Sequence, residues 1–172
     1  AVVQERTLMA ELEPAVVIKT EQQNRGPHPV LAGPVDLIRE GGLVGRGKVM
    51  FVAPGERFEM GWGPEAAVRV RRSVDHNVEE SSMLSSWTTQ THKVALRLSN
   101  LGGDPISLRV QERVAISEIE KVKISVLRDK TTAGKAPDSH GFVTWDVSLA
   151  PSERKTIKLA YSVKKHADVS GI

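Results

Sequence analysis

The chain has 172 residues, a length at which a single domain buries roughly 70% of the surface that its unfolded form exposes. Its 24 basic and 21 acidic residues leave a net charge of +3, a balance that does not indicate a nucleic-acid-binding protein. Because the chain has no cysteine, disulfides, thiolate nucleophiles and cysteine-ligated metal sites are excluded. No apolar run approaches the roughly 18 residues of a membrane-spanning helix, so we expect no membrane insertion.

The first half of the chain is typical of short strands separated by glycine and proline. Residues 2–12 fit either a strand or a short helix, and we expect residues 1–14 to form an edge strand or a linker. Phe51 lies in the same row as Val49, which predicts a ring that points into the core. An apolar run at Ala15–Lys19 comes first, and further strands are expected at Val35–Ile38, Lys48–Val52 and Val68–Arg71.

Five segments in the second half alternate apolar and polar residues with a period of two. Such a period places one row against a core and the other in water, which indicates half-buried antiparallel strands. The apolar rows are Val94, Leu96 and Leu98; Ile106, Leu108 and Val110; Val122, Ile124 and Val126; Val143, Trp145, Val147 and Leu149; and Ile157, Leu159, Tyr161 and Val163.

Two polar stretches, Ser73–Ser86 and Asp129–Gly141, lack this alternation and predict mobile loops. No segment keeps apolar residues at helical spacing over three turns, so no long helix is expected. The sequence therefore predicts an all-β fold, an antiparallel β-sandwich with Greek-key-like connections and little or no helix, formed by residues 1–172 as a single domain. A closed barrel is the alternative.

The basic cluster of Arg69, Arg71 and Arg72 is the candidate site for a partner or an anion. Alternate residues on a strand point the same way about 6.6–7 Å apart, so Arg69 and Arg71 could straddle one acidic group. Arg72 points to the opposite face, where it must reach a carboxylate or escape at the end of the strand. The competing interpretation is an ordinary charged sheet face, or an edge protected against aggregation.

No pattern indicates a catalytic, cofactor or metal site. The five histidines stand at no ligand spacing such as H-x-H. Asp75–His76 and Asp138–Ser139–His140 place reactive residue types side by side, but adjacent residues rarely converge on one point. The serines at 81, 82, 85 and 86 do not match a nucleophile elbow, and Glu79–Glu80 does not match a glycosidase pair. The glycines at 41, 42, 45 and 47 match no phosphate loop. Trp62 is not expected to be a stacking platform, because its ring is expected to fill the core.

Several short motifs keep a common order along the chain: Gly33–Ile38 (GPVDLI), Leu43–Gly47 (LVGRG), Ala53–Phe58 (APGERF), Gly61–Pro64 (GWGP), Val68–Arg72 (VRVRR), Arg113–Glu118 (RVAISE) and Gly141–Trp145 (GFVTW). With them the chain resembles, from about Ala15 to its end, the C-terminal domain of mucoidy-inhibitor-A-like proteins, a bacterial family of unknown function. The resemblance implies that the chain is the C-terminal part of a longer protein, with an N-terminal domain and a coiled coil ahead of it. It also implies an association with exopolysaccharide production, and it transfers no catalytic residue.

These observations favour a non-enzymatic binding or assembly domain that presents sheet faces and loops to a protein partner, which includes a second copy of itself. The alternative is a hydrolase that acts on a cell-envelope polymer through a site in the loops. A third hypothesis is anion or nucleic-acid binding through the arginine strand, although we expect no nucleic-acid partner. The lack of cysteine and of a signal-peptide pattern favours a cytoplasmic location.

Overall fold

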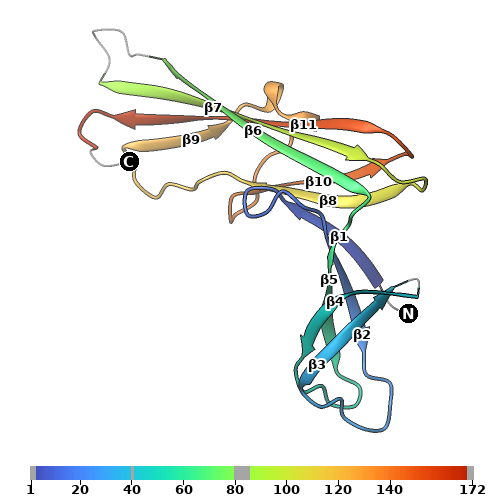
Figure 1. The fold of residues 1–172 in the computed structure, drawn as a ribbon. Coiled ribbons are helices and arrows are strands. Elements are labelled where there is room, and N and C mark those ends of the chain that lie inside the picture. The colour runs from blue at the N-terminus through green and yellow to red at the C-terminus, as the bar shows by residue number, and fades with distance from the viewer. Residues whose placement is uncertain (1–2, 40, 80–85, 170–172) are drawn as a thin grey trace.

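The computed structural model describes residues 3–39, 41–79 and 86–169, which form two packed sheets and a projecting arm of strands (Figure 1). The all-β prediction is confirmed, because the helical elements in these residues are two short 3₁₀ turns, η1 (Arg128–Lys130) and η2 (Thr132–Gly134). No helix among them is long and apolar enough to cross a membrane. The strands are β1 (Val3–Met9), β2 (Val17–Gln23), β3 (Gly33–Arg39), β4 (Gly42–Val49), β5 (Arg57–Pro64), β6 (Val68–Glu79), β7 (Trp87–Asn100), β8 (Ile106–Arg113), β9 (Val122–Val126), β10 (Phe142–Leu149) and β11 (Arg154–His166).

The body of the molecule is a sandwich of two open sheets. One sheet has the strand order β10-β8-β1-β2-β5 and the other has the order β6-β7-β11-β9. Successive strands from β7 to β11 alternate between these two sheets, so the connections cross from layer to layer, as the sequence predicts. Because each sheet keeps two edges of its own, the fold is a sandwich and not the closed barrel that was the alternative.

Strand β1 differs from the sequence prediction in two ways. It pairs with β8 in parallel, with Thr7 opposite Arg109 and Met9 opposite Gln111, whereas the other strand pairs are antiparallel. It also lies between β8 and β2, so residues 3–9 are neither an edge strand nor a linker. The reason is burial, because Leu8 is fully buried in the core and holds β1 in the middle of its sheet.

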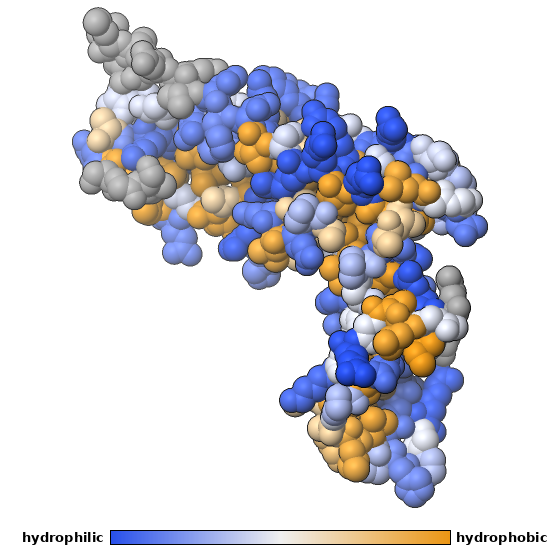
Figure 2. All heavy atoms as spheres, viewed as in Figure 1, coloured by the Kyte–Doolittle hydropathy of each residue, from blue (hydrophilic) through white to orange (hydrophobic). Residues whose placement is uncertain are grey.

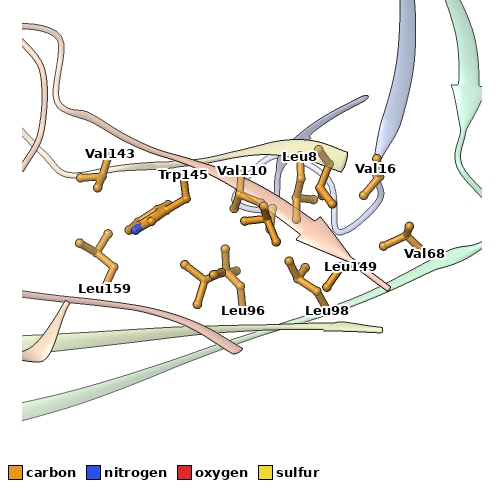
Figure 3. Close-up of a cluster of buried hydrophobic side chains, with 14 of the residues drawn as sticks. Leu8, Val16, Val68, Leu96, Leu98, Val110, Val143, Trp145, Leu149 and Leu159 are labelled. Carbon is orange, nitrogen blue, oxygen red and sulfur yellow. The ribbon is translucent and has the colours of Figure 1, made fainter. Parts of the chain in front are cut away.

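The core lies between the inner faces of the two sheets, where the predicted apolar rows meet (Figure 3). Val143 and Trp145 of β10 face Leu159 of β11, and Val110 of β8 faces Leu96 of β7. The side chain of Trp145 is 3% exposed, and its indole Nε1 donates a 2.9 Å hydrogen bond to the carbonyl oxygen of Thr132. The period-two prediction for the second half of the chain is therefore confirmed, although four members of the inward rows are only half-buried: Ile124, Val126, Tyr161 and Val163.

The arm consists of β3 and β4 together with the adjoining parts of β2 and β5, and it projects away from the sandwich (Figure 1). Its base is tied by Glu65, 8% exposed, whose Oε2 lies 3.0 Å from Nε of Arg6 and whose Oε1 lies 3.9 Å from Nη2 of Arg39. The prediction that Phe51 is buried is wrong, because β4 ends at Val49 and the alternation ends with it. Phe51 is 57% exposed.

The prediction of a loop at residues 73–86 is wrong for residues 73–79. Strand β6 continues to Glu79 and pairs with β7 in unbroken register. Residues 80–85 lie outside the described part of the chain. The second predicted loop, residues 129–141, is anchored at its start by Thr131, which is buried. The hydroxyl of Thr131 donates to the carbonyl of Leu127 and accepts a hydrogen bond from the backbone N–H of Ala160. Its start is therefore held against β11 rather than left mobile.

Replacement of Trp145 tests the core. We expect Trp145→Ala to lower the free energy of unfolding by about 3–5 kcal/mol, because it removes a buried ring and the hydrogen bond to Thr132. Urea denaturation measures this loss, and Phe51→Ala, at an exposed position, should change it by less than about 0.5 kcal/mol. A loss below about 1 kcal/mol for Trp145→Ala contradicts the packing described here.

Candidate interaction face

The three arginines of β6 are divided between the two faces of their sheet. Arg69 and Arg71 are exposed on the outer face, opposite Ser99 and Arg97 of β7. Arg72 points inward and binds Glu112 of β8 across the sandwich, with Nε 3.0 Å from Oε1 and Nη2 3.0 Å from Oε2. The predicted need of Arg72 for a carboxylate is thus confirmed, and Arg72 does not join the other two arginines in a surface site.

Glu112 is an acidic residue inside the core, with a side chain that is 1% exposed. A buried carboxylate is costly unless a cation and hydrogen bonds satisfy it, and the guanidinium of Arg72 supplies both. The hydrogen bond to Glu112 in turn raises the pKa of Arg72 above its ordinary value. The nearby hydroxyl of Tyr161 also has a raised pKa, chiefly because the ring is partly buried. The pair therefore joins the two sheets inside the buried region, next to the apolar row that contains Val94 and Leu159.

The outer face of β6, β7 and β11 carries six exposed basic side chains in adjacent rows. The register places Arg71 beside Arg97, and Arg69 and Arg154 on either side of Ser99. Lys93 and Lys158 follow in the next two rows, opposite Ala160 and Ala95 respectively. Figure 2 shows hydrophilic side chains over the part of the sandwich that β6 crosses. We call this set the basic band: Arg69, Arg71, Lys93, Arg97, Arg154 and Lys158.

None of the six side chains forms an ion pair with any of the described residues. Basic residues elsewhere do pair, as Arg57 does with Glu21 and Arg109 with Glu5. Like charges directly opposite on neighbouring strands, such as Arg71 and Arg97, repel and destabilise the sheet. Such a local conflict, which no ion pair offsets, is typical of a functional surface.

The band continues into a hollow of about 530 Å³ on the same face. Its floor includes the small side chains of Ala95 and Ala160, which leave room between their long neighbours. Lys93, Lys158 and Lys130 line it, and two carboxylates, those of Asp75 and Asp129, line it as well. The hollow is therefore cationic by one charge, and it is large enough to admit an acidic side chain of a partner.

Aromatic rings are placed away from the band. Trp62 lies in the arm, half-buried, and its Nε1 donates a 2.8 Å hydrogen bond to Oγ1 of Thr20. Trp87 starts β7, five rows on the same face from Arg97, with Nζ of Lys123 5.2 Å from its ring centroid and the ring of His166 at 81° to it. The arginine rows thus hold no ring on which a nucleic-acid base could stack.

The arm exposes apolar side chains in two places. Leu31, Met50 and Phe51 lie at its tip, and Ile38 and Leu43 lie near the β3–β4 turn, each more than half exposed. Figure 2 shows both clusters on the side of the arm that faces the viewer. Exposed apolar clusters of this kind mark surfaces that contact other proteins.

Among the described residues, Asp138, Ser139 and His140 do not form a catalytic triad. Oγ of Ser139 lies 3.3 Å from Nδ1 of its neighbour His140, but Oδ1 of Asp138 accepts the backbone N–H groups of His140 and Phe142 and so does not orient the imidazole. These bonds lower the pKa of Asp138. The glycines at 41–47 build the β3–β4 hairpin. Ser81, Ser82, Ser85 and Glu80 lie outside the described residues.

The structure brings together two histidines that the sequence keeps apart. His76 and His92 are opposite each other on β6 and β7, and their Nδ1 atoms are 2.8 Å apart. Burial, and then the nearby charge of His76, lower the pKa of His92 below its ordinary value. No group of three or more potential metal ligands exists among the residues described.

The fold and its charged face define a β-sandwich domain with a candidate binding surface and no assembled active site in its described part. A family model described as a domain of unknown function (DUF4139) matches residues 3–166, and the chain belongs to that family. It is 20% identical to Protein F37C4.5 of Caenorhabditis elegans over 152 residues, which cover 82% of this chain but 27% of that relative. No solved structure matches the chain.

The Arg72–Glu112 pair leads to a stability prediction. We expect Arg72→Ala to cost about 3–5 kcal/mol of unfolding free energy, because it leaves the carboxylate of Glu112 buried without its cation. Arg69→Ala, on the same strand but in solvent, should cost less than about 0.5 kcal/mol. The double change Arg72→Met with Glu112→Leu should restore much of the loss, since apolar residues of similar size often replace a buried pair well. Equal losses for Arg72→Ala and Arg69→Ala in urea denaturation would falsify this role.

A second prediction concerns pH. Because the pKa of His92 is lowered in the folded state, the unfolded chain takes up the proton first as the pH falls below about 6.5. Stability should therefore be full above that pH and decrease as the pH falls towards the lowered folded pKa. Urea midpoints measured from pH 7 to about pH 5 should decline less in His92→Gln than in the unchanged protein. Parallel declines would show that His92 does not contribute.

Proposed function

We propose that this domain is a non-enzymatic binding and assembly module that docks an acidic protein partner on the basic band. The observation that supports this proposal is the set of six adjacent cations, none of which forms an ion pair with a described residue. The carboxylate of Asp75 lies opposite one of them, Lys93. Neighbouring strands stand about 4.7–4.9 Å apart, and alternate residues along one strand about 6.5 Å apart. The band is therefore a regular grid, and a pair of guanidinium groups such as those of Arg71 and Arg97 can bind one carboxylate from two sides.

Two features favour a protein over a nucleic acid as the partner. The arginine rows hold no aromatic ring on which a base could stack. The apolar clusters of the arm offer a second surface suited to a protein. The rival hypothesis of a hydrolase with a site in the loops has no convergent nucleophile–base pair among the described residues to support it.

The resemblance to mucoidy-inhibitor-A-like proteins extends the proposal to a setting. On that basis the domain belongs to a longer bacterial protein, and its docking step takes part in control of exopolysaccharide production at the cell envelope. A domain that covers 27% of its nematode relative fits a role as one module among several.

The dependence of binding on the charge of the basic band can be tested with a fluorescein-labelled oligoglutamate peptide, whose binding is followed by fluorescence anisotropy. The triple change Arg69→Gln, Arg71→Gln and Arg97→Gln should weaken binding at least about tenfold. The matched control is Lys19→Gln, Arg46→Gln and Arg57→Gln, which removes the same number of cations from pairs with Glu59, Asp36 and Glu21. We expect the control to lose less than about twofold, and both proteins to keep the unfolding free energy of the parent within about 1 kcal/mol.

Two results would overturn the proposal. Equal weakening in the band variant and the control would mean that the peptide senses only net charge. Tighter binding of a single-stranded oligonucleotide of the same charge, lost in the band variant, would make nucleic acid the partner. Binding should also weaken as salt rises from about 50 mM to 200 mM, because exposed charge pairs are screened.

A further inference from the structure

His76 and His92 form a fixed pair on the inner face of the four-stranded sheet. They are 16 residues apart in sequence and directly opposite in the β6–β7 ladder. Their rings meet edge to face, with centroids 4.6 Å apart and planes at 83°. The ring of His92 also lies flat on Tyr161 of β11, with centroids 4.7 Å apart and planes at 2°, so the orientation of that imidazole is set by its neighbour.

We propose that His76 and His92 form a binding site for a divalent transition-metal ion that takes ligands at right angles, Cu²⁺ or Ni²⁺. Imidazole nitrogens bind such ions at about 2.0–2.1 Å, so two ligands at 90° stand about 2.9 Å apart, and two at the tetrahedral angle about 3.4 Å apart. The observed separation of the two Nδ1 atoms is 2.8 Å. This separation, which in the absence of an ion is that of a hydrogen bond, is closer to adjacent positions of a tetragonal ion than to two positions of a tetrahedral one.

The surroundings of the pair leave an ion a path and open coordination positions. His76 is exposed, and His92 lines a hollow of about 780 Å³ between the inner face of the sheet and residues 115–119. Water can therefore complete the coordination shell. The cation nearest along β6 on the same face, Arg72, is neutralised by Glu112 and does not repel a metal.

Binding requires no net loss of protons from the hydrogen-bonded pair. Without metal, the two Nδ1 atoms are in hydrogen-bond contact, and one imidazole donates its Nδ1–H to Nδ1 of the other. When both Nδ1 atoms bind the ion, the donating ring releases that proton and takes one up at Nε2. Each imidazole thus remains neutral and keeps one N–H.

The test is calorimetric titration of the whole chain with CuCl₂, NiCl₂ or ZnCl₂ alone. We expect Cu²⁺ to bind most tightly, Ni²⁺ next and Zn²⁺ weakest. His76→Thr, which suits an exposed strand position, and His92→Gln should each weaken Cu²⁺ binding at least about tenfold. His28→Gln and His140→Gln, at exposed histidines elsewhere, are the matched controls and should leave it unchanged within about twofold.

A second measurement guards against loss of fold in the variants. The electron paramagnetic resonance spectrum of the Cu²⁺-loaded parent should show hyperfine coupling to two nitrogens, and that of His76→Thr to one. Cu²⁺ should also raise the melting temperature of the parent and not of the variant, since an ion that binds only the native state stabilises it. The proposal is overturned if His76→Thr and His92→Gln keep the Cu²⁺ affinity of the parent, if His28→Gln or His140→Gln loses it, or if Zn²⁺ binds as tightly as Cu²⁺.

Discussion

The organisation of this domain depends on a difference in length between its two layers. Strands β6, β7 and β11 have 12, 14 and 13 residues, whereas β8 and β10, which cover them, have 8 each. Where the layers overlap, the inner rows are apolar and buried. The Arg72–Glu112 pair lies within the overlap, one row before the apolar row of Val74, Val94 and Leu159. Beyond that row the inner face becomes His76, His92 and Tyr161. In the part of the long sheet that the other sheet does not cover, polar side chains on the inner face stay in contact with water, so they cost less free energy there.

This difference explains which parts of the fold the sequence predicts. The rows that end in Leu98, Val110 and Leu149 alternate cleanly because one face is covered and the other is wet. Residues 73–79 were predicted as a loop because β6 leaves the covered region there, so a strand can carry polar side chains on both faces. The burial of Phe51 was predicted wrongly for the opposite reason, since an alternating pattern continued past the end of β4. Neither the parallel pairing of β1 nor the projection of the arm has a local sequence signal.

The candidate sites differ in how far they could be predicted. Spacing on one strand was enough to separate Arg69 and Arg71 from Arg72, because a strand has only two faces. The other four cations of the basic band come from β7 and β11, and their approach to β6 depends on pairing register, which the sequence leaves open. The same holds for the histidine pair, which no ligand-spacing motif contains because its two members stand on different strands.

Both proposed surfaces rest on the β6–β7 ladder, one on each face. Asp75 and Lys93, at the outer edge of the basic band, are the immediate chain neighbours of His76 and His92, which point inward. A backbone shift that moved one pair would move the other, since a planar peptide bond joins neighbouring residues of each strand. An ion held between the imidazoles fixes the separation of the two strands where the band meets its hollow, and so limits how the outer face can adapt to a partner. The two faces of one hairpin are in this way parts of a single mechanical unit.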